Sequence, residues 1–451
     1  MIFGDYRPDR HAHPSRTKNQ STLRRRLLVS CFGLGLMLPA AGSAEDLSAI
    51  LPTLVSNHNL IEAARSDLSA AQERYQVARG GYYPEFETTS NWGHEYQTKP
   101  ADDNTSLAFS EADFSITQRL YDFGATDATI DAAKLTVRQY EAQLTSTEQT
   151  LLLRGLTAYT NVARAKEAIG YAERAENNIK KQAELEDIRV QKGGGYSSDV
   201  LQAKTQLAGA QARLVAAQGT LKVARNSFKG VFGRFPENEA DMSRPALPLH
   251  LIPANVEDAV AIALDNNPQL TAAQLSADIA DETRKNAEAS GFRPTIDVVA
   301  DVKYKKNVSG TVGFKREALG KVEINFPFNL GLTAINTLKA AEQDHTSVLR
   351  RFRDARDQVE EQVRNSWAQL EVARLNSELL RSQAELAEAF LDQARREREL
   401  GQRSLLEVTQ AETNLLNASS DAASAEADVA IAGFSLLNAM GQLSLDAALN
   451  Q

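Results

Sequence analysis

The hydrophobic pattern of this chain is helical over very long stretches. Between residues 352 and 394, apolar or small side chains recur every three or four positions, which is coiled-coil spacing. The members of this seam are Phe352, Ala355, Val359, Val363, Ser366, Leu370, Ala373, Ser377, Leu380, Ala384, Ala387, Leu391 and Ala394. About half of them are small, so neighbouring helices can pack closely. The pattern predicts one long helix packed along its length.

No proline or glycine interrupts residues 332–400, and the similar segment 125–192 contains only Gly155 and Gly170. At 1.5 Å per residue, a helix over 332–400 reaches roughly 100 Å. No globular domain needs a helix of this length. We therefore expect a rod or the wall of a tube.

Shorter segments alternate apolar and polar residues with a period of two. The alternation is clear in 113–120, 296–304 and 321–328, and a weaker fourth strand is marked by aromatic residues within 86–96. Segments of about ten residues with one apolar face suit a membrane barrel, although an ordinary half-buried sheet shows the same alternation. The long helices favour the barrel, because nothing else in the chain would bury such a sheet.

Strands in lipid must close into a barrel, since open edges cannot be left there. This chain offers four strands, and known barrels begin at about eight. Several copies must therefore share one barrel. Three copies would give twelve strands, although the arithmetic also permits two copies.

An internal repeat runs through the chain with an offset near 208 residues. Gly81–Pro84 recurs as Gly291–Pro294, and Asp199–Ala203 recurs as Glu407–Ala411. Because one spacing holds from end to end, the protein is two copies of one unit.

The repeat divides the chain into a predicted order of segments. Each unit holds a helix, a strand pair and a long helical hairpin. The first repeat covers 45–235 (helix 46–80, strands 82–123, hairpin 125–233), and the second covers 256–441 (helix 256–290, strands 292–330, hairpin 332–441). A proline-rich linker over 236–255 separates them, and a tail over 442–451 follows.

Residues 1–44 have the features of a secretory signal peptide. Arg24–Arg26 precede an apolar run of about 12 residues, Leu27–Leu38, and small residues follow at Ala40–Ala44. The run is too short to span a membrane. Leu28–Cys31 resembles a lipid-attachment box, but most of the apolar run follows Cys31, which favours the signal peptide. The signal does not need residues 1–22, so the native start stays open.

Composition narrows the function further. Without residues 1–44, which hold seven Lys/Arg and two Asp/Glu, the net charge changes from −9 to about −14. This argues against nucleic acid and anionic membrane surfaces as partners. The sole cysteine lies in the leader, the histidines lack metal spacing, and no nucleophile or phosphate-binding motif is present. We predict a protein that is not an enzyme and binds no cofactor or metal.

The ordered set of features resembles the TolC-type outer-membrane efflux proteins over 45–441. The residues that carry the resemblance are Asn266–Leu270 at the opening of the second unit and the junctions Tyr121–Gly124 and Phe328–Gly331. The resemblance implies a mainly α fold with a smaller membrane β part. It also implies a homotrimer whose twelve strands form an outer-membrane β-barrel, continued by an α-barrel about 100 Å into the periplasm.

Partners also follow from the resemblance. It implies docking to an inner-membrane transporter, of the ABC type, and to a periplasmic adaptor, with outer-membrane lipid around the barrel. Asn226–Gly233 and Lys321–Leu338 look more like the type I secretion branch than the drug-efflux branch. Exporters of large adhesins are the first group we would name within that branch.

The resemblance also implies a gate at the hairpin turns, which are Gly193, Gly194, Gly195 and Gly401. Asp199 and Arg403 match the positions of a polar latch between neighbouring hairpins. Glu407 and Gln410 match two acidic rings of the pore constriction. Because Gln410 departs from the pattern, a trimer would hold one ring of three carboxylates, and we expect weaker cation preference.

Each gate residue also has a simpler interpretation. Ser404 and Glu407 have the spacing of a helix capping box. Asp199 favours a helix start through the dipole, and Arg403 would then be a solvated turn residue.

Two other functions explain part of the pattern. A periplasmic adaptor also uses a long helical hairpin, but usually one hairpin together with compact β domains. A soluble coiled-coil scaffold leaves the leader and the alternating strands unexplained. Only the duct predicts a trimer that needs detergent.

Overall fold

The computed structural model describes residues 47–98, 100, 104–194, 196–239, 242–328 and 330–449. These residues belong to one compact unit. The predicted leader over 1–44 and the turn residue Gly195 lie outside the described residues. Among the helices in the described ranges, none is both long enough and apolar enough to cross a membrane.

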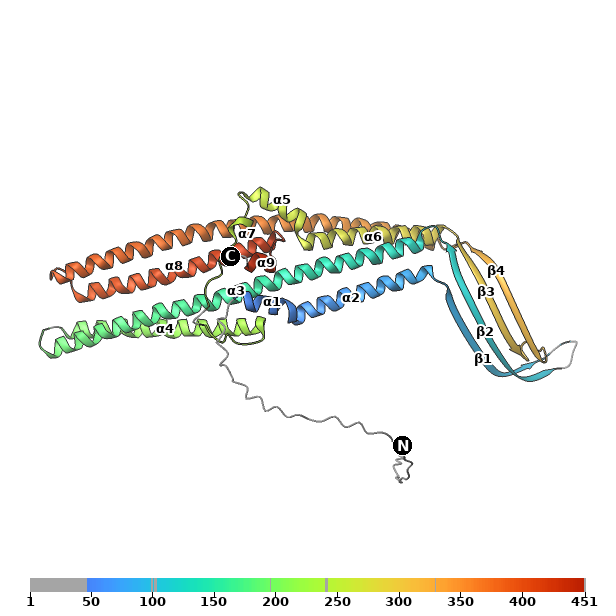
Figure 1. Cartoon of the computed structure of the whole chain (residues 1–451), viewed down its shortest axis with the longest axis horizontal. Helices are drawn as coiled ribbons and strands as arrows, with labels where there is room; N and C mark the ends of the chain where they lie inside the picture. Colours follow the sequence, from blue (N-terminus) through green and yellow to red (C-terminus); the bar gives the residue numbers. More distant parts are fainter. Residues whose placement is uncertain are drawn as a thin grey trace, which may run out of the picture. The chain divides into compact units, whose positions relative to one another are not determined.

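Helices and strands follow one order twice (Figure 1). The first half contains α1 (Leu47–Asn57), α2 (Asn59–Arg79), η1 (Gly80–Tyr82), β1 (Glu85–Gln97), β2 (Thr105–Tyr121), α3 (Ala125–Gln191) and α4 (Ser197–Phe232). After η2 (Leu249–Leu251), the second half contains α5 (Val256–Asn266), α6 (Pro268–Phe292), β3 (Thr295–Lys306), β4 (Phe314–Asn325), α7 (Thr333–Glu399), α8 (Leu405–Ala439) and α9 (Leu445–Leu449).

The long helices are present as the periodicity predicts. Helices α3 and α7 have 67 residues each, which corresponds to about 100 Å. All thirteen members of the predicted α7 seam are buried or half-buried, while most of the positions between them are exposed. The seam therefore faces neighbouring helices, as predicted.

The prediction of a single helix at the start of each repeat is wrong, because two consecutive helices occupy each of these segments. His58 separates α1 from α2, and its Nδ1 accepts a hydrogen bond from the backbone N–H of Leu60 at 3.1 Å. Asn267 separates α5 from α6, and Pro268 lacks the N–H that a continuous helix would need. Polar side chains that cap a new helix here compete with the unbroken hydrogen-bond ladder.

The four strands form one antiparallel sheet in the order β1-β2-β3-β4. The central pair, β2 and β3, joins the two repeats: Arg119 and Asp297 lie opposite each other and form a 3.1 Å ion pair. Rings meet on the other face, where Phe114 lies 6.5 Å from Phe86 and 6.3 Å from Tyr304 between centroids. The sheet thus has one charged and one apolar face, and within the described residues β1 and β4 each keep one open edge.

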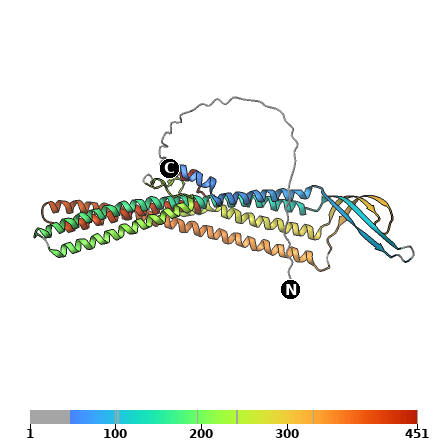
Figure 2. The same ribbon diagram turned by 90° about the horizontal axis from the view of Figure 1, so that it is seen from below.

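The helices lie side by side in a layer four helices wide. Near the sheet the order is α2-α3-α6-α7, and toward the hairpin turns it is α4-α3-α8-α7. Figures 1 and 2 show both halves, with the sheet at one end and the hairpin turns at the other. The edges of the layer are therefore α7 on one side and α2 with α4 on the other.

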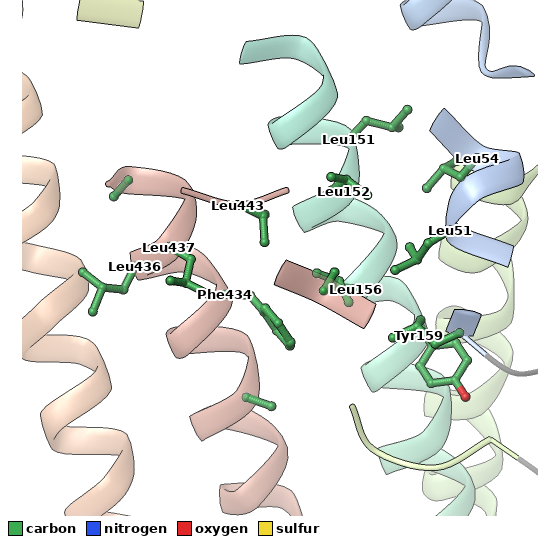
Figure 3. Packing of buried hydrophobic residues seen from close by; sticks show 14 of the residues in the cluster. Leu51, Leu54, Leu151, Leu152, Leu156, Tyr159, Phe434, Leu436, Leu437 and Leu443 are labelled. Carbon is green, nitrogen blue, oxygen red and sulfur yellow. The ribbon is translucent and has the colours of Figure 1, made fainter. Parts of the chain in front are cut away.

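The apolar core is largest midway along the layer. Leu51 of α1 and Leu156 of α3 are at most 1% exposed, as are Phe434 and Leu437 of α8. Figure 3 shows these side chains converging from three helices. The segment predicted as a tail contributes Leu443 to the same core and forms α9, which contacts α1.

The proline-rich linker is tied to the helices by ion pairs. The guanidinium of Arg225 in α4 donates to Glu239 at 2.6 Å. Arg244 of the linker pairs with Glu426 of α8 and donates to the carbonyl of Ala423 at 3.3 Å. The linker therefore lies along the helices at the level of the core.

Candidate functional site: the hairpin tips

Both hairpin turns are built on a glycine with a positive φ. Gly193 has φ +79° and Gly401 has φ +73°, a region that side chains with a Cβ rarely adopt. The N–H of Gly194 donates to the carbonyl of Arg189 at 2.9 Å, and that of Gln402 donates to Glu397 at 2.9 Å. Such bonds satisfy carbonyls at the helix end, so both hairpins reverse direction within a few residues.

Glu407 completes the capping box at the start of helix α8. Its Oε2 accepts hydrogen bonds from the backbone N–H and the hydroxyl of Ser404, both at 2.9 Å, and the N–H of Glu407 donates to the Ser404 hydroxyl at 3.2 Å. The capping box that the sequence predicts is therefore confirmed. Hydrogen bonds from the backbone and the hydroxyl of Ser404 hold the pKa of the Glu407 carboxyl below its ordinary value. The carboxylate is exposed and stays ionised at neutral pH.

Arg403 is held on its own hairpin. Its Nε donates to Oε2 of Glu397 at 2.7 Å, and its guanidinium lies 5.2 Å from the centroid of the Phe390 ring. The side chains of Arg403 and Glu397 are only 24% and 28% exposed. Hydrogen bonds from Gln393 and Arg403 lower the pKa of Glu397. This arginine is thus a packed residue with a partner, not a freely solvated one.

Asp199 lies in the first turn of α4 and does not contact Arg403 within one chain. Its N–H donates to the carbonyl of Tyr196 at 3.0 Å, and the hydroxyl of Ser198 lies 3.4 Å from Oδ1. No ion pair of Asp199 occurs among the residues that the structure describes. Gln410, on α8, is exposed and donates to Oδ1 of Asn414 at 3.0 Å. The four predicted residues are therefore at the tips, but only Arg403 and Glu407 make strong contacts there.

Glu397, Phe390 and two buried polar groups of the first hairpin also lie near the tips, although the sequence pattern did not predict them. Gln182 and Glu186 are 5% and 6% exposed, and Gln182 Nε2 and Glu186 Oε2 make no hydrogen bond among the described residues. The nearest cation of Glu186 is Arg189, at 3.8 Å. The sequence signal that could have predicted the buried pair is the spacing of four residues between Gln182 and Glu186, which places both on one face of α3.

Comparison with known proteins gives the family. The outer membrane efflux protein family matches residues 50–234 and again 259–442. The chain is 26% identical to the outer membrane efflux protein BepC of Brucella suis, over 90% of this chain and 87% of that protein. It is 23% identical to the outer membrane protein TolC of Escherichia coli, over 93% and 87%.

Two further similarities concern secretion and fold. The alkaline protease secretion protein AprF of Pseudomonas aeruginosa is 23% identical over 90% of this chain and 86% of its own length. The solved structure of the outer membrane protein VceC of Vibrio cholerae superposes with a TM-score of 0.73 at 17% identity, covering 87% of this chain and 95% of that one.

These matches confirm the predicted fold class, mainly helical with a small sheet, and the predicted resemblance. The family match also disfavours the periplasmic adaptor and, at the level of the family, an enzyme, because the matched family is one of outer membrane efflux proteins. The chain belongs to the outer membrane efflux protein family, which places it in the outer membrane with its helices on the periplasmic side.

Proposed function

We propose that this protein is the exit duct of a type I secretion or efflux system, formed by three copies of the chain. The observation that carries the proposal is the pair of open edges that a single chain leaves. Among the described strands, β1 and β4 each have one edge without a pairing strand, and lipid does not tolerate open strand edges. Three copies supply twelve strands, enough to close a barrel.

The helical layer has matching edges. Exposed apolar side chains follow the outer face of α7 at steps of three, four and seven residues: Val372, Leu375, Leu379, Leu386 and Phe390. The opposite edge, α4, exposes Leu201, Val215 and Val223. Coiled-coil spacing on an uncovered face favours packing against another helix. In the proposed trimer, α7 of one copy packs on α4 of the next, which closes a helical tube in line with the barrel.

The tips serve as the gate in this proposal. Asp199 of one hairpin and Arg403 of a neighbouring hairpin form the latch, and Glu407 forms the single ring of three carboxylates, with Gln410 beside it. Exposed ion pairs are worth about 0.2–1 kcal/mol each, so three of them make a barrier that docking of a transporter can overcome. Glu397 competes for Arg403 in the same chain, and its 2.7 Å contact therefore favours the unlatched arrangement.

The partners in the proposal are an inner-membrane transporter, of the ABC type, and a periplasmic adaptor. The type I branch is supported by the likeness to AprF, whose name records protease secretion, while BepC is named for efflux. The leader over 1–44 would direct export of the chain.

The experiment is to extract the full chain from outer membranes in detergent and measure its oligomeric mass after subtracting bound detergent. Three chains that conduct ions in a planar bilayer are the expected result. A monomer that stays soluble without detergent would overturn the proposal.

A further inference from the structure

The two faces of the sheet differ in charge, and every acidic side chain of the strands lies on the same face. The pairing register places all nine Asp and Glu side chains of the four strands on one face, together with five Lys and Arg. Their ion pairs fix this assignment: Lys303 lies 3.5 Å from Asp113, and Lys305 lies 3.0 Å from Glu317. This charged face therefore neutralises much of its own charge.

On the opposite, apolar face, the only side chains of the strands that carry a full charge at neutral pH are cationic. Lys306 and Arg316 lie there, with His94 as the remaining ionisable group besides tyrosines. Arg316 is placed by its contact with the Tyr304 ring, 5.5 Å from guanidinium carbon to centroid, and Tyr304 belongs to the ring cluster of this face. Among the described residues, neither Lys306 nor Arg316 forms an ion pair with a carboxylate.

Lys306 is the last residue of β3, and Arg316 lies near the start of β4, two positions away across the register. The connection between β3 and β4 lies at the end of the sheet away from the helices (Figure 1). On β3, outward apolar positions run from Ile296 to Tyr304, and Lys306 follows. Ten residues at about 3.3 Å, tilted by about 40°, rise about 25 Å. This is the height of the apolar band of a membrane barrel, so Lys306 lies where the hydrocarbon ends.

Aromatic side chains flank the cations at this level. Lys306 is opposite Ser110 and Phe314, and Ser110 is in turn opposite Trp92, so one row across the sheet reads Trp92-Ser110-Lys306-Phe314. Trp92 and Phe314 are 80% and 73% exposed. Aromatic rings with cations between them are typical of the membrane–water interface.

We infer that Lys306 and Arg316 form a binding site for a phosphate-bearing lipid headgroup of the outer leaflet. The inference rests on the proposed function, since it requires the apolar face to contact lipid. Guanidinium and ammonium groups bind phosphate through charge-assisted hydrogen bonds, and the strand residues described on this face include no carboxylate to compete. The negative charge of the whole chain argued against anionic membrane surfaces, but the carboxylates of the strands lie on the other face, so that argument does not apply here.

The test measures binding of bisphosphorylated lipid A to the full-length oligomer in detergent, with the dephosphorylated lipid as reference. The variant is Lys306→Gln with Arg316→Gln. One basic residue near an anionic surface changes affinity about fivefold, so we expect about 25-fold weaker binding of the phosphorylated lipid. Binding of the dephosphorylated lipid should not change, and raising the salt concentration should reduce the difference between the two lipids.

The chain provides a matched control one residue away. Lys305→Gln with Lys315→Gln removes two cations at the same level of the same strands, but on the charged face. This control should weaken lipid binding less than twofold. Equal loss in both double variants, or equal binding of both lipids to the unmodified protein, would overturn the inference. The charge-keeping pair Lys306→Arg with Arg316→Lys must retain binding, which covers the case in which the neutral variant fails to assemble.

The oligomeric mass separates this inference from the proposed function. If the unmodified protein is a trimer that conducts ions but binds the phosphorylated and dephosphorylated lipids equally well, only the inferred headgroup site is wrong. If no trimer forms in detergent, the proposed duct is wrong, and the site falls with it.

Discussion

The second hairpin, α7 and α8, buries a leucine near its tip, whereas the first, α3 and α4, buries a carboxylate in the same region. At an offset of 208 residues, Leu391 and Ala394 occupy the positions of Ala183 and Glu186. In the second hairpin the leucine fills the seam against Val408. In the first, the large side chain is the carboxylate of Glu186 one turn later, and one of its oxygens makes no hydrogen bond within the part of the chain that the structure describes.

The helix that follows each turn differs in the same direction. Ser404 caps α8 with a full capping box, but Tyr196 caps α4 without any side-chain hydrogen bond. A buried polar atom without a hydrogen bond costs about 1–3 kcal/mol, and a missing cap costs about 1 kcal/mol. We therefore expect the two copies of the hairpin to differ in stability, with the first hairpin opening more easily at its tip.

The largest expected effect is the loss of the second hairpin's apolar seam. Leu391→Ala should lower the local free energy of opening at the α7–α8 tip by about 2–5 kcal/mol, because it leaves a cavity at a 3% exposed position. Hydrogen exchange of the tip amides in the detergent-solubilised protein measures this. Glu388→Ala, at an exposed position of the same helix, is the control and should stay within about 0.5 kcal/mol. A similar effect of both variants would contradict the packing described for Leu391.

Copying the apolar seam into the first hairpin should remove the difference. Ala183→Leu with Glu186→Ala should raise the opening free energy at the α3–α4 tip by about 1–3 kcal/mol, because the buried carboxylate is gone. Slower hydrogen exchange confined to that tip is the expected result. Glu184→Ala, exposed on the same turn, serves as the control. Faster exchange would mean that the first seam cannot accept a leucine.

Removing the cap of α8 should have an effect of about 1 kcal/mol. Ser404→Ala removes the hydroxyl that donates to the Glu407 carboxylate but keeps the backbone N–H, which is the larger cause of the lowered pKa, so the pKa of Glu407 should rise only part of the way toward its ordinary value of 4.5. Because the pKa is depressed in the folded chain, the ionised carboxylate stabilises the cap above about pH 4.5, and this stabilisation is lost as the pH falls through the folded-state pKa.

Hydrogen exchange of the first turn of α8 between pH 7 and pH 4 tests the cap, after correction for the intrinsic exchange rate. The unmodified protein should lose protection at low pH, and Ser404→Ala should show less pH dependence. Tyr196→Ser, which supplies a capping hydroxyl to α4, should increase the protection of the amides in the first turn of α4. An identical pH profile of the first turn of α8 in the unmodified protein and in Ser404→Ala would exclude a stabilising role for the cap.

The smallest effect is expected from Glu397→Gln. It removes the charge that holds Arg403 on its own hairpin and frees the guanidinium for the proposed latch with Asp199. In planar bilayers the open probability should fall about two- to fivefold, the range of an exposed ion pair. Asp199→Asn should change it in the opposite direction, and a double variant should resemble Asp199→Asn alone. If Glu397→Gln raises the open probability, then Glu397 does not compete with the latch.

Much of the fold could be predicted from the hydrophobic periodicity and from the positions of glycine in the turns. The seam of α7 and the ends of both long helices were predictable because coiled-coil spacing persists up to a glycine turn. The breaks at His58 and Asn267 were not, since a capping side chain and an interior one look alike in a sequence. The partner of Arg403 was also missed: Glu397 reaches it only because the turn at Gly401 folds six residues back on themselves. The pairing of Asp199 stays a prediction, because it depends on a neighbouring hairpin.

The central strand pair has a consequence for the order of assembly. Arg119 and Asp297 are 178 residues apart in the chain, yet they face each other across β2 and β3. Contacts between residues so distant in sequence form slowly, because a long loop must close first. The sheet cannot complete its centre until most of the chain has been synthesised and delivered. Until β3 arrives, the edge of β2 that faces away from β1 therefore stays unpaired. A chaperone or assembly factor for membrane strands would act at this step.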